Sequence, residues 1–349
     1  MSPRSAAFAA LAAVLVLAAS AQAATKTVYM GAPPSAAKAL GNLRAEANEY
    51  FPSRITVRRG DKVRFVPAGL HTVDFLKGGT PVPLVSGGAP VSGARDAAGL
   101  PFWFNGQPEL QLSPSLLNIV FGKTFSYNGS GELQSGLPVD TKPLTVKFLK
   151  TGVFTYFCNV HPGMSGTVNV IGGKPPSTKA DAKVVKKQAK QAVKDARDLQ
   201  HALVAKNQVL LGNSSRSGVE VLAMYPGQIT VPVGSTVTFS ISRWSRAAHT
   251  ATTGPGDPFN DPGSFLGKIS SSITSPPFDQ AGVYPSDPRG APALLTPNLH
   301  GNGFWSSGFM DRANSTPQPK TQQVKIVAPG TYAFYCMLHP FMRVVVNAQ

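Results

Sequence analysis

The sequence contains little cysteine, little histidine and few acidic side chains. Its 349 residues include 2 Cys, 6 His and 17 Asp plus Glu, against 33 Lys plus Arg. Two cysteines exclude a disulfide-rich scaffold, and no Cys-x-x-Cys-His motif is present for covalent haem attachment. After residue 23 no apolar run reaches the roughly 20 residues that a membrane-spanning helix needs. We therefore expect a chain without disulfides, covalent haem or a membrane anchor.

What the sequence does contain is a set of four residues that occurs twice, with a constant offset of 178 positions. The two sets are His71, Cys158, His161 and Met164, and then His249, Cys336, His339 and Met342. Each cysteine follows an aromatic segment of period two, which is typical of a strand. Two imidazoles, a thiolate and a weak axial thioether are the ligands of a type 1 copper site. The sequence thus predicts two copper ions, Cu(I) or Cu(II), per chain.

Other interpretations of the motif are weaker. A lone cysteine or methionine is usually an apolar core residue, but that does not explain two complete sets at one offset. Structural zinc sites use more Cys and His and do not use Met. The repetition therefore favours copper over both alternatives.

The ligand loops also resemble those of a known family. Cys158-x-x-His161-Pro-x-Met164 and Cys336-x-x-His339-Pro-Phe-Met342 are similar to the short loop of amicyanin, within the plastocyanin, pseudoazurin and amicyanin group of cupredoxins. Segments 50–65 and 225–239 resemble the strand, turn and strand before the first histidine ligand. The resemblance implies an all-β chain of two tandem Greek-key cupredoxin β-sandwiches. Many members have Asn after the first histidine to connect the ligand loops, whereas this chain has Thr72 and Thr250, each with a hydroxyl for one such bond.

Composition divides the chain into four segments. Residues 1–23 have the charged start, apolar stretch and Ala21-Gln-Ala23 site of a signal peptide. Residues 24–172 and 208–349 are predicted to be the two sandwiches, and residues 173–207 a linker whose basic helix covers 179–206. Gly- and Pro-rich insertions at 78–117 and 260–303 either cover the copper-facing end or decorate the surface. The signal peptide predicts export to the periplasm or the cell exterior.

The excess of basic residues indicates which kinds of partner the protein attracts. The net charge is +16, and the 173–207 linker alone has nine basic and three acidic residues. Such a surface attracts acidic redox proteins or an anionic cell envelope, and a solvated helix without a partner is equally compatible with it. No nucleic-acid recognition motif accompanies the charge.

The predicted function is transfer of single electrons between redox proteins, with His161 and His339 as exits through exposed ring edges. The alternative is copper sequestration or delivery in the cell envelope. An enzyme of the nitrite reductase or laccase type needs further histidines, usually as His-x-His, and only His201 and His300 remain. An apolar ligand loop favours Cu(I), so the loop with Met337 and Leu338 predicts a higher reduction potential at the second site.

Overall fold

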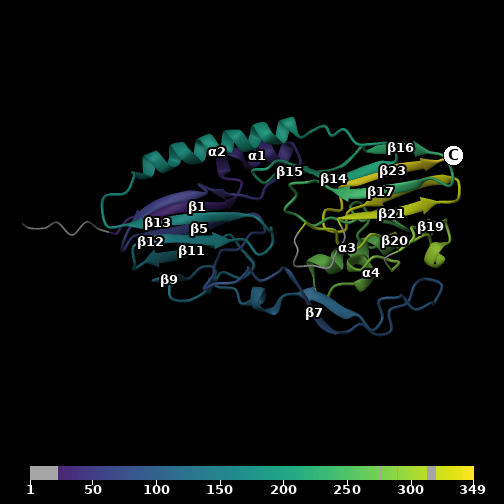
Figure 1. Ribbon diagram of the computed structural model, residues 1–349, viewed down its shortest axis with the longest axis horizontal. Coiled ribbons are helices and arrows are strands. Elements are labelled where there is room, and N and C mark those ends of the chain that lie inside the picture. The colour runs from purple at the N-terminus through teal and green to yellow at the C-terminus, as the bar shows by residue number, and fades with distance from the viewer. Residues whose placement is uncertain (1–22, 276, 289, 313–319) are drawn as a thin grey trace, which may run out of the picture.

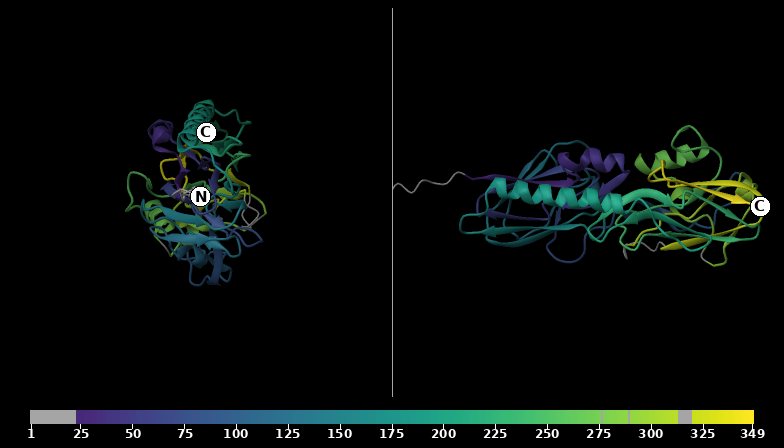
Figure 2. Two further views of the ribbon diagram at one scale, coloured as in Figure 1. Left: turned by 90° about the vertical axis from the view of Figure 1, so that its left-hand side faces the viewer. Right: turned by 90° about the horizontal axis from the view of Figure 1, so that it is seen from above.

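The computed structural model describes residues 23–275, 277–288, 290–312 and 320–349. This part of the chain contains 23 strands and four α-helices. All strands except β7 and β8 form two β-sandwiches, which lie end to end in an elongated molecule (Figures 1 and 2). The predicted signal peptide lies outside the described residues except for its last position. None of the helices in the described ranges is long and apolar enough to cross a bilayer.

The first sandwich consists of two five-stranded sheets. One has the order β3-β1-β5-β11-β9 and the other β10-β6-β12-β13-β4. The strands are β1 (Thr25–Gly31), β3 (Tyr50–Phe51), β4 (Arg54–Arg58), β5 (Lys62–Ala68), β6 (Asp74–Phe75), β9 (Thr124–Tyr127), β10 (Leu133–Gln134), β11 (Leu144–Phe148), β12 (Gly152–Phe157) and β13 (Ser165–Ile171). Alternate residues of these strands are buried between the sheets, where Tyr156 packs edge-on against Tyr50 and Phe65.

The second sandwich repeats this plan with one addition. Its sheets have the orders β19-β21-β17-β14-β15-β2 and β16-β23-β22-β18-β20. The strands are β14 (Gln208–Ser214), β15 (Val219–Tyr225), β16 (Gln228–Val231), β17 (Thr236–Ile241), β18 (Thr252–Thr253), β19 (Ala293–Leu295), β20 (Trp305–Ser306), β21 (Thr321–Ile326), β22 (Gly330–Tyr335) and β23 (Arg343–Ala348). The added strand is β2 (Ala45–Ala47), which comes from the first half of the chain.

Strand β2 joins the two sandwiches through backbone hydrogen bonds. It pairs with β15 in antiparallel register, and Glu46 lies opposite Glu220. Each of these glutamates stands five residues before an aromatic residue followed by proline, Phe51-Pro52 and Tyr225-Pro226. The pairing therefore brings corresponding positions of the two halves together.

The linker forms a helix that also contacts both halves. Helix α2 (Thr178–Asp198) packs on α1 (Pro34–Asn42), on β3 and on β15 (Figure 1). Its N-terminus is capped by Ser177, whose side chain accepts a hydrogen bond from the Ala180 N–H. The buried residues of the predicted apolar face are Ala189, Ala192 and Ala196. Small side chains let the helix approach the two sheets closely.

The prediction that this helix continues to residue 206 is wrong. The helix ends at Asp198, and Leu203 is fully exposed. The Leu199 carbonyl accepts hydrogen bonds from the Asn213 amide at 2.9 Å and the Tyr225 hydroxyl at 3.1 Å. These side chains satisfy the end of the helix, so the chain turns into β14 instead of extending it.

The first insertion packs against the second sandwich. It contains the hairpin of β7 (Val85–Pro90) and β8 (Pro108–Leu112), followed by the 3-10 turn η1 (Pro114–Leu117). The second insertion contributes α3 (Phe265–Thr274), α4 (Gln280–Val283) and the turn η2 (Leu299–Gly301). Phe104 stacks on Tyr284, and the Gln280 side chain bonds to the backbone of Leu110 at 2.9 and 3.0 Å. The insertions thus hold the sandwiches together. The sequence predicted only that they cover the copper-facing end or decorate the surface.

Candidate metal centres

Each candidate ligand loop begins where a central strand ends. Cys158 directly follows β12, and Cys336 directly follows β22. Both loops close in the same way. The Cys158 N–H donates to the Met164 carbonyl at 3.0 Å, and the Met164 N–H to the His161 carbonyl at 3.0 Å. The corresponding distances in the second loop are 3.1 and 2.8 Å.

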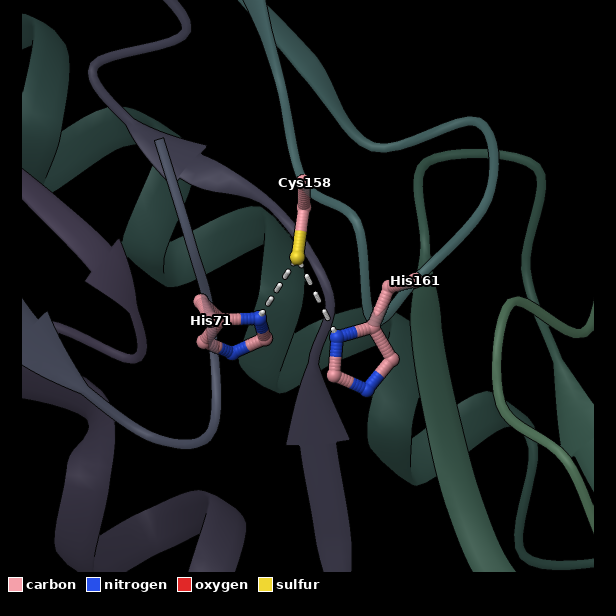
Figure 3. A group of neighbouring side chains, drawn as sticks. All are labelled: His71, Cys158 and His161. Carbon is pink, nitrogen blue, oxygen red and sulfur yellow. Dashed lines mark hydrogen bonds between the residues drawn. The ribbon is translucent and has the colours of Figure 1, made fainter. Parts of the chain in front are cut away.

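The first loop meets His71 at the end of the first sandwich. Figure 3 shows the Cys158 sulfur between the Nδ1 atoms of the two histidines. The Sγ–Nδ1 distances are 3.9 Å to His71 and 3.7 Å to His161. All three residues are buried.

The second loop meets His249 in the same way. Cys336 Sγ lies 3.8 Å from His249 Nδ1 and 3.6 Å from His339 Nδ1. With bonds of about 2.0 Å to imidazole and 2.3 Å to thiolate, the lengths typical of zinc, a trigonal metal would separate nitrogen from sulfur by roughly 3.7 Å. Both donor sets fit a metal in that plane, and their mixture of imidazole and thiolate suits type 1 copper.

The two methionines lie in the cores that contain the cysteines. Met164 is 0 % exposed and Met342 1 % exposed, and each belongs to the same apolar cluster as its cysteine. Their position on the closed loop is compatible with the axial role that the sequence predicts.

The threonines after the first histidines connect the two ligand segments. Thr72 Oγ1 accepts the Asn159 N–H at 2.7 Å, and Thr250 Oγ1 accepts the Met337 N–H at 2.8 Å. In addition, each threonine N–H donates to the cysteine sulfur, at 3.5 Å in the first site and 3.4 Å in the second. A hydroxyl thus replaces the amide at this position.

Around this shared frame the first site has its own polar network. The Thr72 hydroxyl also donates to Asn159 Oδ1 at 2.6 Å, and the Asn159 amide donates to Asp74 at 2.9 Å and to the Val82 carbonyl at 3.1 Å. Asn159 is only 3 % exposed. Its polarity is therefore directed into protein hydrogen bonds and does not hydrate the metal centre.

Ionisation differs between the two cysteines in the metal-free protein. Burial raises the pKa of Cys158, although hydrogen bonds from neighbouring backbone groups oppose this. Burial also acts to raise the pKa of Cys336, but its hydrogen bonds with His249 and His339 outweigh burial and lower the pKa well below the usual value. The hydrogen bonds of the second site thus favour the thiolate form of its cysteine.

The pKa values of His71 and His249, the first histidine of each ligand set, also differ. Burial lowers the pKa of His71 to about 4. Burial acts in the same direction on His249, but hydrogen bonds with Cys336 and Glu220 raise its pKa to about 10. Glu220 is a strand residue that sequence reasoning missed, because a single Glu in β15 has no local pattern that marks it as buried.

The prediction that His161 exposes its ring edge is wrong. The residue is only 6 % exposed, because the first ligand loop faces the second sandwich. Asn159 and Val160 of this loop line a cavity of about 80 Å³ together with Arg246 and Leu338 of the other half. His339 is partly exposed.

The two remaining histidines lie away from these centres. His300 Nδ1 is 3.1 Å from Asp96 at the contact between the insertions, and His201 lies in the segment after α2. Within the described ranges, groups of three or more potential metal ligands are found only at the two centres above.

The fold and the donor sets together define a protein of two tandem β-sandwiches, each with residues that fit one type 1 copper. No family model and no curated protein matches the sequence.

The solved structures that resemble the chain include a plastocyanin, an auracyanin and a purple cupredoxin. Oxidised plastocyanin from Dryopteris crassirhizoma is 18% identical, with 41% of this chain and 99% of that chain covered and a TM-score of 0.21. Reduced auracyanin from Roseiflexus castenholzii is 17% identical, with coverages of 41% and 94% and a TM-score of 0.23. The purple cupredoxin from Nitrosopumilus maritimus is 15% identical, with coverages of 41% and 98% and a TM-score of 0.19. At these values the class assignment depends on the sheets and ligand sets themselves.

Proposed function

We propose that the protein is an exported electron carrier with two type 1 copper ions. The observation that carries this proposal is the pair of buried His-Cys-His groups, whose nitrogen and sulfur atoms already have the separation of a trigonal centre. Copper bound there would supply a one-electron couple. The closed loops and the threonine bonds hold the ligands in one geometry for both oxidation states.

Burial also favours retention of copper over its release. His249 is 0 % exposed and His71 4 %, so a competing acceptor cannot reach these ligands without opening the loop. A protein for sequestration or delivery would need such access. We therefore place the electron carrier first and keep delivery as the alternative.

Entry and exit of electrons are assigned to the second site. His339 is partly exposed, whereas His161 is covered by the other sandwich. Exposed lysines along α2 give one side of the molecule a positive charge, which attracts acidic redox partners or an anionic envelope surface. The apolar leader and small-residue site of residues 1–23 support export.

Copper loading of the purified protein tests the function. We expect two copper ions per chain and an intense red-region absorption that ascorbate bleaches and an oxidant restores. A stoichiometry near one, or a colourless protein in oxidant, would overturn the proposal. Rapid loss of Cu(I) to a chelator would favour delivery, and mass spectrometry of the secreted chain should find Ala24 at its N-terminus.

A further inference from the structure

The second site has a buried carboxylate on one of its ligands. Glu220 Oε1 lies 2.9 Å from His249 Nε2, and both residues are 0 % exposed. Since His249 Nδ1 faces the cysteine sulfur, Nε2 is the nitrogen that carries the ring proton and donates to Glu220. The Ser245 hydroxyl lies 2.7 and 2.9 Å from the two carboxylate oxygens and holds the group in place.

The first site has no equivalent of this carboxylate. Among the described residues no carboxylate forms an ion pair with His71, whereas such pairs are found for His249 and His300. The Nε2 atoms of both histidines lie near glycine backbone, 2.9 Å from a Cβ added to Gly31 or Gly69 at His71 and to Gly212 at His249, so the carboxylate is what distinguishes the second site. Glu46, which occupies the position of Glu220 in the first half, is partly exposed and contacts neither histidine.

A cation lies beside the first site. Arg246 extends from the second sandwich, and its Nη1 donates to the Asn48 carbonyl at 2.6 Å. Its Nε would be 3.7 Å from a Cβ at Gly163, in the first ligand loop. Arg246 is therefore close enough to the first ligand loop for its charge to act on the first site.

The carboxylate of Asp74 opposes the effect of Arg246 on the first site, but it lies farther from the ligands. Its hydrogen bonds lead to Cys158 through the Asn159 amide, the Thr72 hydroxyl and finally the Thr72 N–H, which donates to the sulfur. Because the interaction between charges weakens with distance, a carboxylate in contact with a ligand has the larger effect. The apolar residues of the second loop also have only a small effect on the difference in reduction potential. Leu338 and Phe341 are only partly buried, and Asn159 of the first loop is itself only 3 % exposed.

We propose that Glu220 and Arg246 hold the two sites at different reduction potentials, so that an electron received at the second site settles at the first. This proposal rests on the electron-carrier function. With one thiolate, an oxidised centre has a net positive charge and a reduced centre is neutral. Glu220 stabilises the oxidised form of the second site, and Arg246 destabilises the oxidised form of the first.

The transfer is balanced within the chain. One electron leaves the second site, which is oxidised from Cu(I) to Cu(II), and enters the first, which is reduced from Cu(II) to Cu(I). The two ligand loops border the same cavity, so the electron crosses the contact between the sandwiches. The first site then acts as an internal store, and the second as the point of exchange with partners. This order of potentials is the reverse of the one that the loop sequences predict.

Single-site variants measure the two potentials separately. Cys336→Ser leaves the first site and Cys158→Ser leaves the second, and each is titrated potentiometrically through its absorption. We expect the first site to be at least tenfold easier to reduce, which is about 59 mV for one electron. Equal potentials, or a higher potential at the second site, would overturn the proposal. Absence of any copper colour would instead refute the electron-carrier function.

Charge variants then assign the cause. In the single-site backgrounds, Glu220→Gln should raise the second potential and Arg246→Gln should lower the first, each by a tenfold change in the equilibrium. Matched controls are Glu46→Gln and Arg243→Gln, which remove the same charges at positions without a ligand contact. Shifts no larger than those of the controls would refute the assignment.

A conservative variant keeps the role of Glu220 testable if Glu220→Gln abolishes copper binding. If Glu220→Gln does not bind copper, Glu220→Asp keeps the charge but withdraws it from His249. We expect a smaller rise in potential with an unchanged absorption maximum. A potential equal to that of the parent protein would contradict the role of Glu220.

Discussion

The threonine bond between the ligand segments can be tested through the stability of the metal-free protein. Thr72→Val keeps the shape of a side chain that is 0 % exposed but removes its hydroxyl. The Asn159 N–H and Oδ1 then lose partners at 2.7 and 2.6 Å. A buried polar group without a partner costs about 1 to 3 kcal/mol. Because the remaining amide bonds of Asn159 persist, we expect a loss of roughly 2 to 4 kcal/mol.

Urea unfolding followed by circular dichroism provides the measurement. The transition of the first sandwich should move to lower urea with an unchanged slope, since the surface exposed on unfolding is the same. Thr72→Ser is the matched control, because it keeps the hydroxyl and should lose less than half as much. If Thr72→Val unfolds at the parental urea concentration, or if the serine variant is equally damaged, the hydroxyl does not hold the loops together.

Further outcomes concern the sites and their surroundings. Cys158→Ser should remove about half of the red-region absorbance and Cys336→Ser the other half; loss of all colour in either would show that ligands are shared between the sandwiches. Burial raises the pKa of Glu49 to about 7 from 4.5, so its contribution to stability is complete below pH 4.5 and is lost as the pH rises through 7. Glu49→Gln should remove this pH dependence, about 3 kcal/mol for a shift of this size, in thermal unfolding. Phe104→Ala should cost about 3 to 5 kcal/mol and expose residues 78–117 to proteolysis, whereas Leu100→Ala, at a position 63 % exposed, should leave cleavage unchanged.

The sequence was sufficient to predict what depends on local pattern. The strand before Cys158 has period two and ends at the ligand, and the same is true of the strand before Cys336, so both loops could be placed without coordinates. The fixed distance to His71 and His249 identified the remaining imidazoles. Alternation, turn residues and ligand spacing all act within one sandwich, and such features leave a direct trace in the sequence.

What the sequence could not predict depends on the contact between the sandwiches. Nothing in the segment around Glu46 indicates that it completes a sheet of the other half, because a three-residue strand has no periodicity to detect. The burial of His161 follows from the same contact, as does the position of Arg246 beside the first loop. The helix end at Asp198 was missed because Asn213 and Tyr225, which donate to the Leu199 carbonyl directly after it, lie in later strands.

The pairing of β2 with β15 has the form of an isologous interface, in which one surface meets its own copy about a local two-fold axis. Glu46 and Glu220 face each other across that axis. In a homodimer every substitution would appear on both sides, and the two metal centres would have to remain identical. Within one polypeptide the two glutamates can diverge, and here only one of them reaches a histidine. Covalent connection of the halves is thus what would permit the proposed direction of electron flow through a strand pairing that is itself symmetric.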